Sequence, residues 1–90
     1  MTAADTKIAR AAQARRILED TLVVEAFEAI EREAFSAWCN SEPEDLERRE
    51  LVAAELRAMK RFRQKLQAVM SDGVVATFDR NMVDRKQVNG

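Results

Sequence analysis

Apolar side chains recur every three or four residues along two long stretches of the chain, which is the spacing of one face of an α-helix. The first stretch ends near residue 39 and carries Leu22, Val23, Ala26, Phe27, Ile30, Ala34, Ala37 and Trp38. The second lies between the turn after residue 39 and Gly73, and carries Leu46, Val52, Leu56, Met59, Phe62, Leu66, Val69 and Met70. The pattern predicts an all-α chain with two long helices.

Turn-forming and capping residues predict where these helices begin and end. Ser41 and Glu44 have the spacing of a capping box, and Pro43 suits a first helical turn, so we expect the second long helix to begin at residue 42. Gly73 follows the last residue of the periodic pattern, and glycine commonly closes a helix, so we expect the helix to end there.

The first helical stretch is expected to break at Asp20-Thr21, because both residues are good N-caps and poor interior residues. The segment before the break, "TKIARAAQARRIL", is also helical in character. The residues after Gly73 are expected to form a short helix or tail. This organisation divides the chain into a helical-hairpin oligomerisation domain, residues 1–73, and a C-terminal segment, residues 74–90.

A turn of only a few residues forces the two long helices to lie antiparallel. Two helices side by side form one layer, and each buries only one stripe, whereas Val24 and Phe35 lie on the flank of the first stripe. A layer of this size is not expected to be stable alone, so the sequence predicts an obligate oligomer. The expected hairpin and oligomer interface comprises Val24, Phe27, Ile30, Phe35, Trp38, Leu56, Met59, Phe62 and Leu66.

The position of the turn also predicts the register between the two helices. If the turn centres near residue 41 or 42, antiparallel pairing places Trp38 near Leu46 and Phe27 near Leu56. We therefore expect both aromatic side chains to lie at the seam between the helices.

Composition argues against catalysis. The 90-residue chain has no His, one cysteine (Cys39) and two glycines, so it lacks a histidine base, a zinc ligand set and a Gly-rich phosphate loop. We expect no enzymatic activity, no metal and no cofactor. The apolar runs are too short to span a bilayer and no secretory signal pattern is present, so we expect a cytoplasmic protein.

One stretch, "LRAMKRFRQKL" at residues 56–66, carries five basic residues and no acidic one. Helical geometry turns four of them, Arg57, Lys60, Arg61 and Lys65, away from the apolar stripe. They form a candidate surface for non-specific contacts with double-stranded DNA phosphates. The alternative is a solvated helix face, since acidic residues at the start of a helix and basic residues further along it suit the helix dipole.

The fifth basic residue, Arg63, falls inside the apolar stripe. A guanidinium there must pair with a carboxylate or extend its stem to water. The predicted register places it opposite Glu19 and Asp20, so we expect a structural ion pair with one of these carboxylates.

Beyond these patterns, the chain resembles small proteins of tailed bacteriophages and gene-transfer agents. In the first arm, which contains "ARRILEDTLVVEAF", the similarity rests on Arg16, Leu18, Glu19, Leu22, Glu25, Ala26, Phe27, Ala37 and Trp38. In the second arm it rests on Arg63, Leu66, Val69 and Gly73. An Asn-Pro in that pattern is replaced here by Asp20-Thr21.

The resemblance implies a role in DNA packaging, similar to the oligomerisation core of small terminase subunits, which form rings and present DNA to the large subunit. A typical small terminase also carries an N-terminal helix-turn-helix. Here a single short helix stands in that place, which argues against sequence-specific DNA recognition. The implied partners are further copies of this chain, a large terminase subunit and non-specific double-stranded DNA. A docking tail would contain Val74, Val75, Phe78, Met82 and Val83.

A different class of function fits the same pattern. A small helical-bundle dimer or tetramer that acts as an adaptor, chaperone or regulator, without nucleic acid, would also carry these apolar stripes. The mass of the assembly in solution distinguishes the two alternatives.

Overall fold

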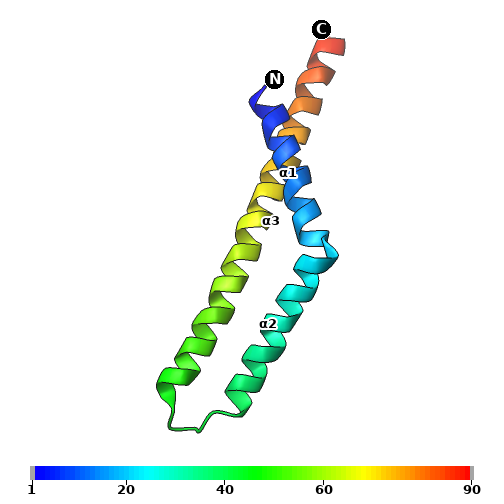
Figure 1. Ribbon diagram of the computed structural model, residues 1–90. Coiled ribbons are helices and arrows are strands. Elements are labelled where there is room, and N and C mark those ends of the chain that lie inside the picture. Colours follow the sequence, from blue (N-terminus) through cyan, green and yellow to red (C-terminus); the bar gives the residue numbers. More distant parts are fainter. Residues whose placement is uncertain (1, 90) are drawn as a thin grey trace. The chain divides into compact units, whose positions relative to one another are not determined.

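The computed structural model describes the backbone of residues 2–89 and the side chains of residues 2–82. This part of the chain is all-helical and contains no strand, which confirms the predicted class. The helices are α1 (Ala3–Glu19), α2 (Thr21–Cys39) and α3 (Leu46–Asn89), as Figure 1 shows.

Contacts divide the chain into two compact units. Unit 1 contains residues 1–18 and 65–90, and unit 2 contains residues 19–64. Helix α1 and the C-terminal part of α3 therefore form unit 1, whereas α2 and the N-terminal part of α3 form unit 2.

The break at residue 20 is present, as the sequence predicts. Asp20 has an extended backbone (φ −62°, ψ 126°) and is the N-cap of α2. Its Oδ1 accepts hydrogen bonds from the backbone N–H groups of Leu22, at 2.9 Å, and Val23, at 3.2 Å. The carboxylate thus satisfies two of the N–H groups that have no partner within the helix.

The predicted start of the second long helix at residue 42 is wrong, because α3 begins at Leu46. The carboxylate of Asp45 accepts a hydrogen bond from the backbone N–H of Arg48 at 3.1 Å, which is the contact of an N-cap. The hydroxyl of Ser41 is used elsewhere, since it donates to the carbonyl of Trp38 at 2.6 Å. Pro43 consequently lies in the turn and not in the helix.

The predicted end of the helix at Gly73 is also wrong, because α3 continues through it to Asn89. No described glycine has a positive φ, so Gly73 does not adopt the left-handed conformation of a helix cap. Its role is close packing in unit 1. A Cβ built at this position would overlap the Cβ of Ala11 and lie 3.2 Å from the carbonyl oxygen of Lys7.

Small side chains allow α1 and α3 to approach closely in unit 1, where Ala14 and Ala76 are the buried hydrophobic residues. The first turn of α1 is held by a capping box that the sequence reasoning missed. The hydroxyl of Thr2 accepts from the backbone N–H of Asp5 at 3.1 Å, and the Asp5 carboxylate accepts from the backbone N–H of Thr2 at 3.3 Å.

Asp5 also links the two helices of unit 1, because its carboxylate forms an ion pair with Arg80 at 2.9 Å. Hydrogen bonds from Thr2, and to a smaller extent the charge and hydrogen bond of Arg80, lower the pKa of Asp5 below its ordinary value. A lowered pKa means that the carboxylate stabilises unit 1 at neutral pH, and that this contribution is lost as the pH falls through the pKa of the folded state.

The close contact at Gly73 gives a direct test of the packing in unit 1. Gly73→Ala should lower the free energy of unfolding by about 1–3 kcal/mol through overpacking against Ala11, although alanine is the better helix former by about 1 kcal/mol. Ala11→Gly should remove the overlap. In a double-mutant cycle measured by urea denaturation, the pair should therefore show a favourable coupling energy. A coupling energy near zero would mean that the two helices do not meet at these residues.

Candidate interaction surfaces

The seam of unit 2 is formed by side chains on the facing stripes of α2 and α3. Ala34 and Val52 are buried in it, and the rings of Phe27 and Phe62 lie 5.9 Å apart between centroids at an angle of 60°. This tilted arrangement is favourable for aromatic rings. Half-buried positions extend the seam on both helices: Val23, Ile30, Ala37, Leu56 and Met59.

This seam differs from the predicted register. Phe27 contacts Phe62 and not the neighbourhood of Leu56, and Trp38 lies against Arg49 and not Leu46. The physical reason is the length of the turn. Because α3 starts several residues later than predicted, each residue of α2 faces a position further along α3.

Trp38 and Arg49 fix the end of unit 2 nearest the turn. The guanidinium carbon of Arg49 lies 4.8 Å from the centroid of the Trp38 ring, a cation–π contact. The Nε–H of the same guanidinium donates to the hydroxyl of Ser41 at 2.9 Å. Ser41 is buried, and no described buried side-chain polar atom lacks a hydrogen-bond partner. Arg49 thereby ties the turn to the first turn of α3.

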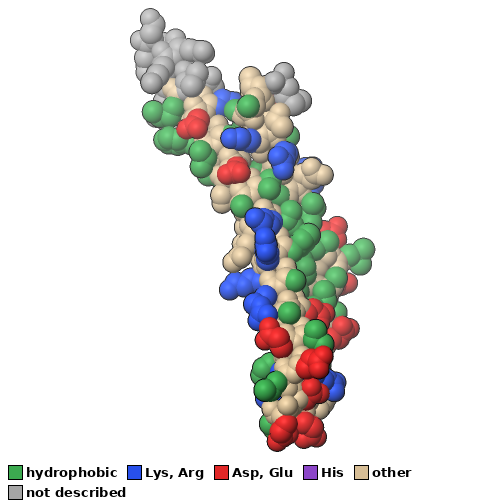
Figure 2. All heavy atoms as spheres, turned by 90° about the vertical axis from the view of Figure 1, so that its left-hand side faces the viewer, with side chains coloured by type: hydrophobic (Ala, Val, Ile, Leu, Met, Phe, Trp, Pro, Cys, Tyr) green, Lys and Arg blue, Asp and Glu red, His purple; other side chains and the backbone are tan. Residues whose placement is uncertain are grey.

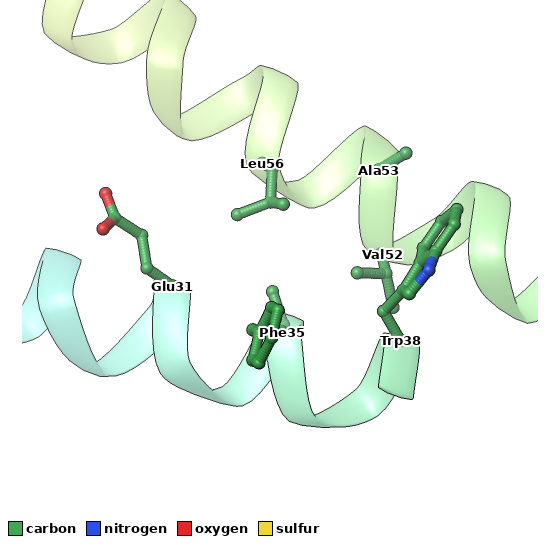
Figure 3. Close-up of a pocket in the computed structure, with 7 residues that line it drawn as sticks. Glu31, Phe35, Trp38, Val52, Ala53 and Leu56 are labelled. Carbon is green, nitrogen blue, oxygen red and sulfur yellow. The ribbon is translucent and has the colours of Figure 1, made fainter. Parts of the chain in front are cut away.

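An apolar hollow opens beside this seam, with a volume of about 300 Å³. Figure 3 shows Phe35 and Trp38 on α2 and Leu56 on α3 around it, with Val52 and Ala53 near the indole. Its complete lining is Glu31, Ala34, Phe35, Trp38, Val52, Ala53 and Leu56. Phe35 remains 72% exposed and Trp38 remains 42% exposed. The hollow is therefore a water-facing surface for apolar side chains and not part of a closed core.

We call this side of unit 2 the groove face. It comprises the residues of the hollow together with two exposed apolar residues at the same flank of their helices, Val24 and Leu46. Other large apolar residues are exposed in unit 2 away from the hollow. These are Leu22, Leu51 and Phe62, with exposed fractions of 75%, 66% and 51%. Leu51 was not predicted from the sequence to be an exposed apolar residue. Its position away from the apolar stripe of α3 could have indicated this.

Arg63 lies on the stripe of α3, as predicted, but its partner is not Glu19 or Asp20. Its guanidinium pairs with Glu31 at 3.2 Å and lies 4.3 Å from the centroid of the Phe27 ring. Asp20 instead caps α2. The side chains of Arg63 and Glu31 are 36% and 48% exposed, so water screens this ion pair.

A second ion pair neutralises one of the four basic residues of the candidate DNA surface. Arg57 pairs with Glu50 at 2.6 Å, one heptad earlier on the same helix. Lys60, Arg61 and Lys65 are exposed, and no ion pair of theirs occurs among the described side chains. Figure 2 shows acidic side chains around the turn of unit 2 and basic side chains further along α3.

The candidate docking segment lies within α3 and not in a separate tail. Val74, Val75, Phe78 and Met82 are exposed along this part of the helix, with Phe78 63% exposed. Their spacing places several apolar side chains toward water on unit 1. Val83 lies outside the residues whose side chains are described.

Comparison of the chain with protein-family models, characterised proteins and solved structures gives no match. Over residues 2–89, none of the helices is long and apolar enough to cross a membrane. Within the same part of the chain, no three His, Cys, Asp or Glu side chains are arranged to hold a metal ion. The chemistry that these surfaces offer is contact between apolar side chains and between charges.

The contact between Arg63 and Glu31 can be tested by a double-mutant cycle. Arg63→Met combined with Glu31→Gln should give a coupling energy of about 0.5–1 kcal/mol, because the pair is partly exposed. Glu19→Gln is the matched control and should give a coupling energy near zero with Arg63→Met. A coupling energy near zero with Glu31→Gln, together with a measurable coupling energy with Glu19→Gln, would instead support the register expected from the sequence.

Proposed function

We propose that the protein is a non-enzymatic, homo-oligomeric helical hairpin of phage-type DNA packaging, similar to the oligomerisation core of a small terminase subunit and acting in the cytoplasm. In this proposal it makes weak, sequence-independent DNA contacts and docks to a large terminase subunit through the exposed apolar residues of unit 1. Its resemblance to small phage and gene-transfer-agent proteins supports the packaging role.

One observation carries the oligomeric part of the proposal. Among the residues whose side chains are described, the buried hydrophobic ones are small, namely Ala14, Ala34, Val52 and Ala76, and none of the large side chains is fully buried. Several large apolar side chains of unit 2 remain exposed, with Phe35, Leu22 and Leu46 each more than 70% exposed. A single copy therefore leaves apolar surface exposed to water, and burial of this surface against other copies would stabilise an oligomer.

The mass of the protein in solution tests this part. Size-exclusion chromatography with light scattering at micromolar concentration should give a homogeneous species of several times 10.2 kDa. A folded monomer would contradict the proposal. A dimer or tetramer that binds no DNA would favour the adaptor class.

The DNA-binding part rests on the exposed bases of α3. If they contact phosphates, affinity for a random-sequence duplex should fall steeply with salt, and each neutralised base should lower the log–log slope by about 0.9. Lys60→Ala, Arg61→Ala and Lys65→Ala together should therefore lower the slope by about 2–3. Arg57→Ala should have a smaller effect, because Glu50 already neutralises that charge.

The matched control for these variants removes the same charge from α1, by Arg10→Ala, Arg15→Ala and Arg16→Ala. All three control residues are exposed. Equal losses of affinity for the two triple variants would show that net charge, and not the α3 surface, governs binding. The absence of measurable binding by the parent protein at low salt would remove the DNA-binding part altogether.

A further inference from the structure

Two residues of opposite charge continue the groove face beyond the apolar hollow of unit 2. Glu28 lies seven residues before Phe35 on α2, and Lys60 lies seven residues after Ala53 on α3. Seven residues make nearly two helical turns, so each charged residue lies within about 20° of the same side of its helix as the lining residue. Both charged side chains are exposed, and no ion pair of either occurs among the described side chains. The groove face therefore has an acidic position on α2 and a basic position on α3.

The register of unit 2 places these four positions in two pairs, one at each of two levels. The contact between the phenylalanine rings and the cation–π contact at Trp38 fix how α2 runs antiparallel to α3. Counted between these two contacts, Phe35 lies level with Ala53, and Glu28 lies level with Lys60. Phe35 and Ala53 accordingly line the same hollow, from α2 and α3 respectively (Figure 3). Each level thus combines a large residue with a small one, or an acidic residue with a basic one.

A two-fold axis parallel to the helices would match both levels of one copy with those of a second. Rotation about such an axis, placed along the groove face, brings α2 of each copy opposite α3 of the other at the same level. The large ring of Phe35 then lies opposite the small Ala53 of the other copy. Glu28 likewise lies opposite the Lys60 of the other copy. Each match occurs twice, because a two-fold contact uses the same surface on both copies.

We infer that two copies pack groove face to groove face about this axis and form a four-helix bundle. The inference deepens the proposed function, since it rests on self-association and names the surface through which copies meet. The ring of Phe35 from each copy enters the apolar hollow of the other, and two ion pairs between Glu28 and Lys60 flank the apolar contact. Arg61 and Lys65 lie on the outer side of α3 by helical geometry, so this contact leaves them accessible to phosphates.

A two-fold axis across the helices is the alternative, and the residues fit it less well. It would bring α2 of each copy opposite α2 of the other, so that the two Phe35 rings met each other and the two Ala53 residues met across a gap. Glu28 would lie level with the acidic turn of the other copy. The parallel axis places both acidic turns at one end, where they are exposed to water and salt screens their repulsion. Size and charge on the groove face therefore favour the parallel axis.

Two charge reversals test the arrangement, because each creates like charges at both copies of one contact. Glu28→Lys would place a lysine opposite each Lys60, and Lys60→Glu would place a glutamate opposite each Glu28. Either variant alone should raise the dissociation constant of self-association roughly tenfold, since two unlike pairs become two like pairs. Light scattering over a dilution series measures this change.

The mixture of the two variants is the decisive measurement. A copy with Glu28→Lys and a copy with Lys60→Glu present opposite charges to each other at both contacts. An equimolar mixture should therefore regain the parent mass at concentrations where each variant alone has dissociated. The matched controls are Glu25→Lys and Arg61→Glu, which make the same charge changes at exposed positions on the outer sides of α2 and α3. Each control alone should keep the parent mass.

Three outcomes would overturn the inference and leave the proposed function intact. One is a parent oligomer whose mass neither Glu28→Lys nor Lys60→Glu changes. Another is a mixture that stays dissociated while both variants keep their helix content by circular dichroism. The third is equal dissociation of the two control variants, because net charge would then govern association. A monomeric parent would instead contradict the proposed function itself.

Crosslinking tests the direction of the axis without changing a charge. Val24 on α2 and Gln64 on α3 lie level with each other, on the groove sides of their helices. In a Cys39→Ser background, a copy with Val24→Cys and a copy with Gln64→Cys should be joined by a short bismaleimide, with more product than either copy gives alone. The axis across the helices would place these two positions at opposite ends of the pair. An oligomer that gives no such product would therefore overturn the parallel axis.

Discussion

The constraint on which the structure depends is that two helices side by side can bury only one stripe each. In unit 2 this stripe buries Ala34 and Val52, while the larger rings of Phe27 and Phe62 remain partly exposed around it. Large apolar side chains away from this stripe, such as Leu22, Phe35 and Leu51, have no helix of the same unit to cover them. Their exposure therefore follows from the number of helices in the unit.

Sequence reasoning could predict the features that depend on local chemistry. The break at Asp20 follows from its side chain, which caps α2, and the helical class follows from the spacing of apolar residues. The role of Gly73 could not be predicted in this way, because a glycine that closes a helix and a glycine that allows close helix packing cannot be distinguished by local sequence. Only the proximity of Ala11, 62 positions earlier in the chain, distinguishes the two roles.

The register between α2 and α3 could not be predicted from the sequence for a related reason. In the segment "NSEPED", both Ser41 and Asp45 can cap a helix, and the choice between them shifts every contact along α3. The structure uses Asp45, because the hydroxyl of Ser41 is engaged by Trp38 and Arg49. The same shift moves Arg63 from Asp20 to Glu31. Arg63 was therefore recognisable as a paired residue, whereas its partner was not.

The charged residues of α3 are separated along the helix by sign. Figure 2 shows acidic side chains around the turn of unit 2, and Lys60, Arg61 and Lys65 lie further along α3, exposed and without an ion pair among the described side chains. Three bases on one copy would give only a weak electrostatic contact with DNA, whereas several associated copies would neutralise more phosphates together. Self-association and DNA contact are therefore linked in the proposed function, because the nearly neutral chain carries its free bases on one stretch of one helix.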